Sequence, residues 1–206
     1  YPLIDGVVNG CPSHLLEPSR LQKIPYSEKF TSSWILGNLT VSVNQAIAPN
    51  GTLSADKITP NSVTSVIRIW NNQTTSASDH SLSFFVKYNG KQFVQLLFGG
   101  GLNPTAYSNF DLINGIVTSG IGEIKDFGNG WYRISISAAL LAATAQVYLW
   151  VIDSANASRG VSSTGNGVDG YYVWGAQLEE GSYPTSYIPN YGTSAGITRS
   201  AETANG

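Results

Sequence analysis

The chain has 206 residues, of which 42% are apolar and only 12% are charged, and its formal net charge is −2. A chain of this length and apolar content can bury a sizeable core within one β-sandwich domain. The 11 Lys and Arg occur singly, which argues against a nucleic-acid partner, and the lack of any run of about 18 apolar residues argues against a membrane-spanning segment.

Glycine and proline interrupt the start of the chain without any sustained periodicity, so we expect residues 1–20 to form a connecting arm. From about residue 39 onwards apolar and polar side chains alternate, which is typical of β-strands. The first alternating segment stops at Pro49-Asn50-Gly51, a strong turn signal, and the alternation returns in residues 65–70.

Residues 81–98 give the clearest predicted hairpin, because two apolar runs flank Asn89-Gly90, a dipeptide that favours a type I′ turn.

Residues 137–146 have helical composition but lie between two predicted strands, so we expect at most one helical turn there. Further strands are predicted within 110–119 (two short ones around Asn114-Gly115), 124–137, 145–153 and 170–181. Strands that recur about every 8 to 12 residues between turns predict an antiparallel β-sandwich. We expect it to span residues 21–190, before a C-terminal tail at 191–206.

Candidate site residues follow from strand alternation, because successive side chains point to opposite faces of a sheet. In residues 170–181 the predicted inward set is Tyr172, Trp174, Ala176 and Leu178. Applied to every predicted strand, the same rule turns a mixture of rings, charges and amides outward: Arg68, Trp70, Phe85, Lys87, Gln95, Arg133, Tyr148, Trp150, Gln177 and Glu179.

Such a mixture favours a carbohydrate-binding face. The apolar C–H faces of pyranose rings stack on aromatic rings, and sugar hydroxyls need the donors and acceptors of amide, carboxylate and guanidinium groups. The predicted stacking platforms are Trp70, Tyr148 and Trp150, and the predicted hydrogen-bonding groups are Lys87, Gln95, Arg133, Gln177 and Glu179. The hypothesis requires both groups to emerge on one shared face. The alternative is that the outward rings cover the back of a sheet that packs on loops or on a partner domain.

The sequence also resembles domains found near the ends of bacteriophage tail and head-spike proteins and in large secreted proteins of Bacteroidetes. The motifs that carry this resemblance are LLEPSR (15–20), IPYSEKFTSSW (24–34), PNGTLSADKI (49–58), FVKYNG (85–90), FDLINGIV (110–117), GNGWYRISIS (128–137), WGAQLEEGSYPTSYIPNYG (174–192) and ITRSAE (197–202). These domains look like relatives of jelly-roll carbohydrate-binding modules. The resemblance therefore implies a jelly-roll sandwich, an extracellular or virion location and a polysaccharide partner.

Three further expectations concern calcium, which the resemblance implies, the charge of the polymer and the oligomeric state. Calcium is common at the edge of such sandwiches, and Glu28, Asp56 and Asp169 are the candidate ligands by position, although no acidic loop of the usual calcium-binding type is present. Lys and Arg on the predicted face would suit an anionic polymer that carries sulfates or uronic acids. As part of a phage fibre, the chain would form an oligomer.

Signals of catalysis are sparse in this sequence. The single cysteine, Cys11, and the two histidines, His14 and His80, have no neighbours at metal-ligand spacing. Glu179 and Glu180 are adjacent and so face opposite ways, and no nucleophile elbow is present. We therefore expect a binding module and not an enzyme. The alternatives are a structural or receptor-binding domain of a phage fibre or adhesin without glycan affinity and, least supported, a polysaccharide lyase or hydrolase.

Overall fold

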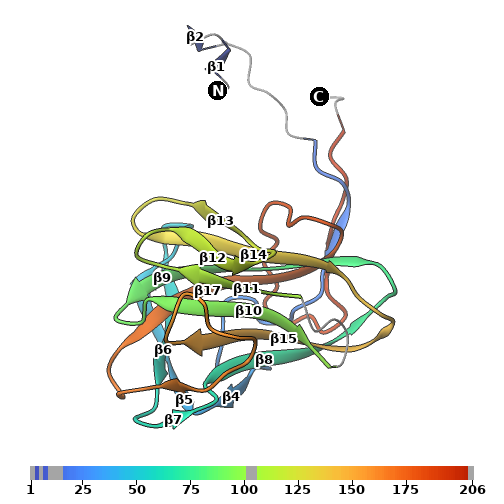
Figure 1. Cartoon of the computed structure of the whole chain (residues 1–206). Helices are drawn as coiled ribbons and strands as arrows, with labels where there is room; N and C mark the ends of the chain where they lie inside the picture. The colour runs from blue at the N-terminus through green and yellow to red at the C-terminus, as the bar shows by residue number, and fades with distance from the viewer. Residues whose placement is uncertain (1–2, 5–6, 9–15, 101–105, 204–206) are drawn as a thin grey trace.

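The computed structural model describes residues 3–4, 7–8, 16–100 and 106–203, and every regular element in these ranges is a β-strand. Two six-stranded antiparallel sheets pack face to face (Figure 1). Sheet 1 has the order β13 (Glu123–Asp126), β14 (Trp131–Ala139), β9 (Asp79–Asn89), β17 (Gly170–Glu180), β6 (Leu53–Pro60) and β5 (Leu39–Ile47). Sheet 2 has the order β12 (Ile116–Gly120), β11 (Tyr107–Asp111), β10 (Phe93–Gly99), β15 (Ala143–Ile152), β8 (Arg68–Thr75) and β4 (Ile35–Gly37). The predicted all-β antiparallel sandwich is confirmed.

The chain passes repeatedly between the two sheets, as in a jelly roll. It leaves β8 in sheet 2 for β9 in sheet 1, returns for β10 to β12, and crosses again for β13 and β14, for β15 and for β17. None of the described segments contains a helix that could cross a membrane. Residues 137–146, with their helical composition, form the end of β14, a short turn and the start of β15.

The core lies between the sheets and consists of the apolar side chains that strand alternation turns inward. The predicted inward residues of β9, β10, β14 and β15 all contribute to it. The fully buried core members from these strands are Leu82, Phe84, Val86, Val94, Leu96, Phe98, Ile134, Ala145, Val147, Leu149 and Val151. Their removal from water is the main favourable contribution to folding, at about 25 cal/mol per Å² of apolar surface.

The prediction that residues 81–98 form a hairpin is wrong, although both strands exist. β9 pairs with β14 and β17 in sheet 1, whereas β10 pairs with β11 and β15 in sheet 2. Gly90 (φ +98°) turns the chain out of sheet 1, and the Lys91 amide then donates to the Gly170 carbonyl at 2.9 Å. Two strands that face one core from opposite sheets show the same alternation of apolar residues as two strands paired in a hairpin. Alternation and a turn dipeptide therefore do not establish pairing.

The predicted inward set of β17 is half wrong, because the strand contains a bulge. Its pairing with β9 shifts between Trp174 and Gln177, and Gly175 there has a φ of +59°. The extra residue reverses the alternation. Tyr171 and Val173 therefore face the core before the bulge, Ala176 and Leu178 face it afterwards, and Tyr172 and Trp174 point outward.

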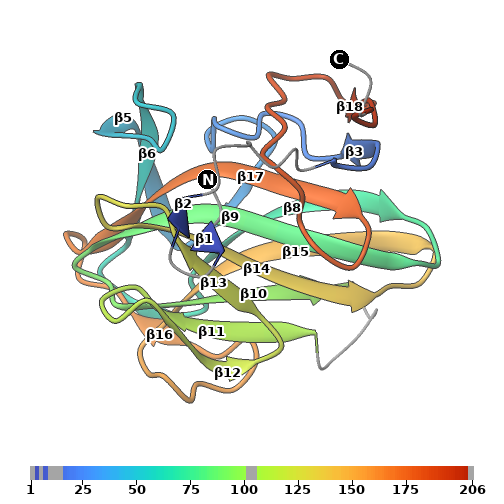
Figure 2. The same ribbon diagram turned by 90° about the horizontal axis from the view of Figure 1, so that it is seen from above.

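Three two-stranded pairs complete the fold: β1 (Leu3–Ile4) with β2 (Val7–Val8), β7 (Thr64–Ser65) with β16 (Ser163–Thr164), and β3 (Arg20–Gln22) with β18 (Ile197–Arg199). Figure 2 shows the β3–β18 pair on the side of sheet 1 that faces away from sheet 2, and the β5–β6 hairpin at the edge of sheet 1. Most of the predicted arm, residues 1–20, lies outside the described residues. The predicted tail contributes β18 to this pair.

Candidate functional site

The eight predicted site residues lie on two opposite faces of the sandwich. All eight project away from the main core, as strand alternation predicted, but they do not share a face. Lys87, Arg133, Gln177 and Glu179 belong to sheet 1, whereas Trp70, Gln95, Tyr148 and Trp150 belong to sheet 2. The expectation of one shared surface is therefore corrected. The outward sides of two packed sheets face in opposite directions, and alternation within a strand does not say to which sheet the strand belongs.

On sheet 2, a loop that follows β15 covers most of the predicted platform. Trp150 is 4% exposed, and its indole Nε1 donates to the Val161 carbonyl at 2.8 Å. Gln95 is fully buried; its Nε2 donates to Asn109 Oδ1 at 2.7 Å, and its Oε1 accepts from the Gly160 amide at 2.8 Å. These side chains hold the loop in place and do not form an open stacking surface.

On sheet 1, the segment after β17 covers Gln177 and Glu179, which are fully buried. Gln177 Oε1 accepts from the Ile188 amide at 2.7 Å, and Glu179 Oε2 accepts from the Thr185 amide at 2.8 Å. Both side chains therefore position residues 183–190 across the outer face of the sheet. Their polar atoms satisfy backbone groups that would otherwise be buried without partners.

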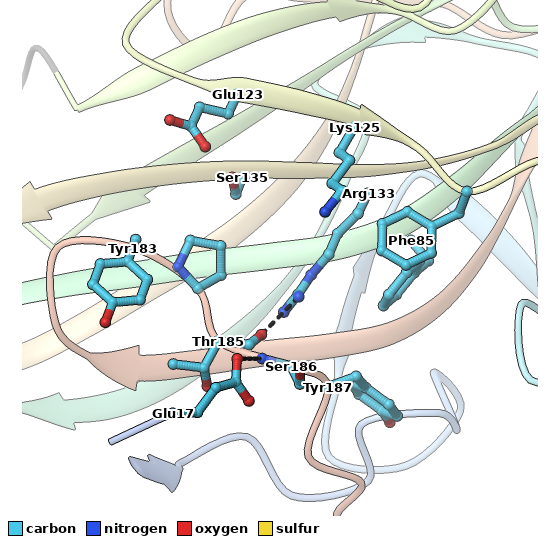
Figure 3. Close-up of a pocket in the computed structure, with 12 residues that line it drawn as sticks. Glu17, Phe85, Glu123, Lys125, Arg133, Ser135, Tyr183, Thr185, Ser186 and Tyr187 are labelled. Atoms are coloured by element: carbon cyan, nitrogen blue, oxygen red, sulfur yellow. Dashed lines mark hydrogen bonds between the residues drawn. The ribbon is translucent and has the colours of Figure 1, made fainter. Parts of the chain in front are cut away.

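A groove of about 390 Å³ lies between this segment and β13, and we call it the sheet 1 groove (Figure 3). β13 supplies Glu123 and Lys125 to one side, the segment after β17 supplies Tyr183 to Tyr187 to the other, and Arg133 of β14 lies between them. The complete lining is Glu17, Phe85, Glu123, Lys125, Phe127, Arg133, Ser135, Tyr183, Pro184, Thr185, Ser186 and Tyr187.

Arg133 is held rigidly in the groove. Its Nη1 donates to the Thr185 carbonyl at 2.7 Å, its Nη2 donates to Ser83 Oγ at 2.9 Å, and its guanidinium carbon lies 5.3 Å from the ring centre of Phe85. Burial lowers the pKa of Arg133, while the nearby carboxylates of Glu179 and Glu17 act in the opposite direction. An arginine pKa lies so far above neutrality that the side chain remains a cation.

Two partly exposed rings, those of Phe127 and Tyr183, line the sheet 1 groove. Tyr183 is 51% exposed and Phe127 is 44% exposed. The Phe127 ring meets Phe85 edge-on at 4.9 Å, and the Nζ of Lys125 lies 5.8 Å from the Phe127 ring centre. The groove thus combines exposed rings with charged groups. The sequence hypothesis required the same combination but assigned it to other residues.

Sequence reasoning missed both Phe127 and Tyr183 because neither lies in a strand. Phe127 precedes Gly128-Asn129-Gly130, and Tyr183 stands between Ser182 and Pro184. Strand alternation cannot turn an aromatic residue of a turn towards the core. A large aromatic residue within a turn sequence is therefore the signal that could have identified both.

A second hollow, of about 340 Å³, adjoins the first and also uses Phe127 as a wall. Lys87, a predicted site residue, lines it together with Trp131 and Asn129. Trp131 is 2% exposed, and its indole Nε1 donates to the Ile47 carbonyl at 2.9 Å. Of the eight predicted residues, Arg133 and Lys87 thus line neighbouring hollows on one face.

The wall of the groove is tied to residues at both ends of the described chain. Glu17 accepts a hydrogen bond from the Ser186 amide at 2.8 Å through Oε1, and its other oxygen forms an ion pair with Arg199. Arg199 belongs to β18, whose partner strand β3 begins three residues after Glu17. Glu17 is consequently engaged in holding the groove together.

The candidate calcium ligands have other partners. Asp56 accepts from the amides of Phe30 and Asn44 at 3.0 and 3.1 Å, and burial raises its pKa despite these hydrogen bonds. Glu28 accepts from the Tyr187 hydroxyl at 3.0 Å, and Asp169 accepts from Asn166 Nδ2 at 2.7 Å. In the ranges that the structure describes, no three His, Cys, Asp or Glu side chains gather as a metal site.

No protein-family model matches this chain, and no curated protein matches it. Its fold is similar to that of several solved structures. One is the Clostridium thermocellum endo-1,4-beta-D-xylanase 10B with CBM22-1 and GH10 modules in complex with xylohexaose, at 13% identity and a TM-score of 0.47 over 82% of this chain and 30% of that one. Another is the CBM22-1 xylan-binding domain of Paenibacillus barcinonensis Xyn10C, at 12% identity and a TM-score of 0.43 over 81% of this chain and 94% of that one.

A third similar structure is a proposed sugar-binding protein from Bacteroides thetaiotaomicron, at 13% identity and a TM-score of 0.41 over 76% of this chain and 92% of that one. The likeness to all three is one of β-sandwich architecture. At these identities and TM-scores, none of the three assigns a ligand or a site to this chain.

Proposed function

We propose that this chain is a non-catalytic polysaccharide-binding module and that its ligand lies in the sheet 1 groove. The observation that carries the proposal is that the partly exposed rings of Phe127 and Tyr183 line a groove that also contains Arg133, Lys125 and Glu123. Rings of this kind can stack on the apolar faces of sugars, at about 1 kcal/mol for each desolvated ring. The charged groups between them can bind sugar hydroxyls.

The charges of the two hollows favour an anionic polymer. Lys125, Arg133 and Lys87 line them, and none of the three forms an ion pair with another described residue. The only carboxylates in the linings are Glu123 and Glu17, and Arg199 already balances Glu17. A polymer bearing carboxylates or sulfates would therefore meet net positive charge. Such a polymer would be encountered in an extracellular or virion setting, in keeping with the resemblance seen in the sequence.

The carboxylates of the groove support binding without catalysis. Glycoside hydrolysis generally needs one carboxyl group as a proton donor and a second as a nucleophile or base, both facing the substrate. Glu123 is exposed on the rim, but Glu17 is buried and already bound to Ser186 and Arg199. The groove thus offers only one carboxylate that is free to act on a substrate.

Affinity electrophoresis in gels that contain neutral or uronate-rich polysaccharides tests this proposal. We expect retardation in at least one anionic polymer, weakened about fivefold or more by Phe127→Ala or Tyr183→Ala, in line with about 1 kcal/mol per ring. Tyr191→Ala is the matched control, because Tyr191 is 74% exposed and does not line the groove.

The proposal fails if no polymer retards the protein, and a structural domain without glycan affinity would then be the better description. It fails equally if Tyr191→Ala weakens binding as much as the groove variants do.

A further inference from the structure

Sheet 2 carries a cationic cluster on the outer face opposite the groove, formed by Arg68, Trp70, Tyr148 and Trp150, and we call it the Arg68 cluster. The guanidinium carbon of Arg68 lies 4.9 Å from the ring centre of Trp70, 5.2 Å from that of Tyr148 and 4.7 Å from that of Trp150. Three rings at these distances hold one cation by interaction with their π-electrons.

The register of the strands explains this cluster. Arg68 is paired with Trp150 of β15 on one side and with Gly37 of β4 on the other, while Trp70 is paired with Tyr148. Gly37 has no side chain, and the ring of Trp70 reaches into the space above it: a Cβ at Gly37 would lie 3.4 Å from Trp70 Cζ3 and 3.5 Å from Arg68 Cγ. Because β4 is the edge strand of sheet 2, the cluster lies one strand from the edge of the sheet.

Arg68 has no acceptor for its N–H groups among the described residues. It takes part in no hydrogen bond or ion pair there, yet its guanidinium nitrogens are not buried and remain open to solvent. An arginine stacked on aromatic rings keeps its donors directed outward in a planar fork, which matches the two oxygens of a carboxylate.

The carboxylates nearest in the topology are bound elsewhere. Asp153, which follows β15, pairs with Lys91 at 2.9 Å. Asp111 of β11 accepts from the amide of Asn114 at 3.0 Å and from Gln92 Nε2 at 2.9 Å. Neither is available to neutralise Arg68, so the charge of Arg68 remains unbalanced on this face.

We propose that the Arg68 cluster is a second binding site, which takes a carboxylate borne on a sugar ring, as in a uronate residue. The carboxylate pairs with the guanidinium of Arg68. The apolar face of the same sugar packs against Trp70, which is only half-buried and whose Nε1 is open to solvent, in contrast to the covered Trp150. This site is separate from the sheet 1 groove and does not require the groove to bind anything.

Nuclear magnetic resonance of the indole N–H signals tests the proposal, with the Phe127→Ala/Tyr183→Ala double variant used to silence the groove. A uronate oligosaccharide should shift the Trp70 signal, assigned by Trp70→Phe, and leave that of Trp150 in place. The same oligosaccharide with its carboxyl groups reduced to alcohols should shift neither. In this background Arg68→Gln should weaken the response about tenfold, as expected for loss of a charge-assisted hydrogen bond.

Arg68→Lys keeps the positive charge but loses the fork, and we expect it to bind severalfold more weakly than arginine. It also provides a test if Arg68→Gln does not fold, which thermal melting would reveal. Any one of three results would overturn the proposal. These are a Trp70 signal that the uronate leaves unchanged, an equal shift with the reduced sugar, or equal affinities, from the Trp70 shifts, for the Arg68 variants and their parent. Failure of the groove proposal would appear in the Phe127 and Tyr183 variants alone and would leave the Trp70 response intact.

Discussion

Glu17 and Ser186 stand 169 positions apart in the chain and are joined by a hydrogen bond of 2.8 Å from the Ser186 amide to Glu17 Oε1. The other carboxylate oxygen of Glu17 pairs with Arg199. One side chain thereby connects the segment before β3, the wall of the groove and the strand β18.

Removal of that carboxylate should destabilise the fold. We expect Glu17→Ala to lower the free energy of unfolding by about 1–3 kcal/mol, since it leaves the Ser186 amide without its acceptor and the Arg199 guanidinium without its ion-pair partner. Glu123→Ala removes an exposed carboxylate from the opposite rim and should change stability by no more than about 0.5 kcal/mol. Urea denaturation of both variants measures the difference, and equal effects would show that the tie contributes nothing.

Trp150→Ala should strongly destabilise the fold. The sequence hypothesis, by contrast, made Trp150 a stacking platform for a ligand. The ring is 4% exposed and packs in a cluster with Leu97, Tyr148, Ile152 and Ala157. Truncation of a buried aromatic side chain costs about 3–5 kcal/mol. Thermal melting should show a large loss for Trp150→Ala and little for Tyr88→Ala, because Tyr88 is 42% exposed. A Trp150→Ala variant as stable as the parent would contradict the burial of this ring.

The bulge in β17 can be tested with two glycine variants. Gly175 (φ +59°) and Gly51 (φ +84°) both have left-handed backbone, so alanine at either position costs about 1 kcal/mol from conformation alone. A Cβ at Gly175 would also lie 2.8 Å from Phe85 Cδ2, whereas a Cβ at Gly51 would meet nothing within 4 Å. Gly175→Ala should therefore cost about 1–3 kcal/mol more than Gly51→Ala in chemical denaturation. Equal costs would indicate that Phe85 moves aside freely.

His80 should make the fold less stable below neutral pH. Burial lowers its pKa, Lys23 acts in the same direction, and the Ser78 carbonyl, Glu180 and Asp79 act in the opposite one. The unfolded chain, with a histidine pKa of about 6.5, then binds more protons than the folded chain at mildly acidic pH. Stability therefore rises with pH through this range and is lost as the pH falls below about 6.5.

Denaturation midpoints at pH 7.5 and pH 5.5 should thus differ more for the parent than for His80→Gln. The other histidine, His14, is present in both proteins, so its contribution cancels in the comparison. An identical pH dependence in the two proteins would exclude His80 as its source.

Alternation along each strand was sufficient to predict the outward direction of all eight candidate residues, because a period of two is a local property of the backbone. It could not place Arg133 and Trp150 on opposite faces, since sheet membership depends on pairing between distant strands. Nor could it predict that the loop around Val161 and the segment around Thr185 would cover those faces. The hydrogen-bonding capacity of Gln95 and Glu179, interpreted as ligand-binding, serves these covering segments.

Gly175 shows a different limit of the same reasoning. A glycine within a strand can mark a flat surface, a close approach of two backbones or a bulge. The alternation on either side of Gly175 fits a regular strand, so only the register with β9 identifies the bulge. The sheet 1 groove depends on the same kind of information, because its walls come from β13, β14 and the segment that follows β17.

The link from Glu17 to Ser186 and Arg199 also bears on how the molecule is made. Glu17 is synthesised long before Ser186 and Arg199, so this link can form only after residue 199 has left the ribosome.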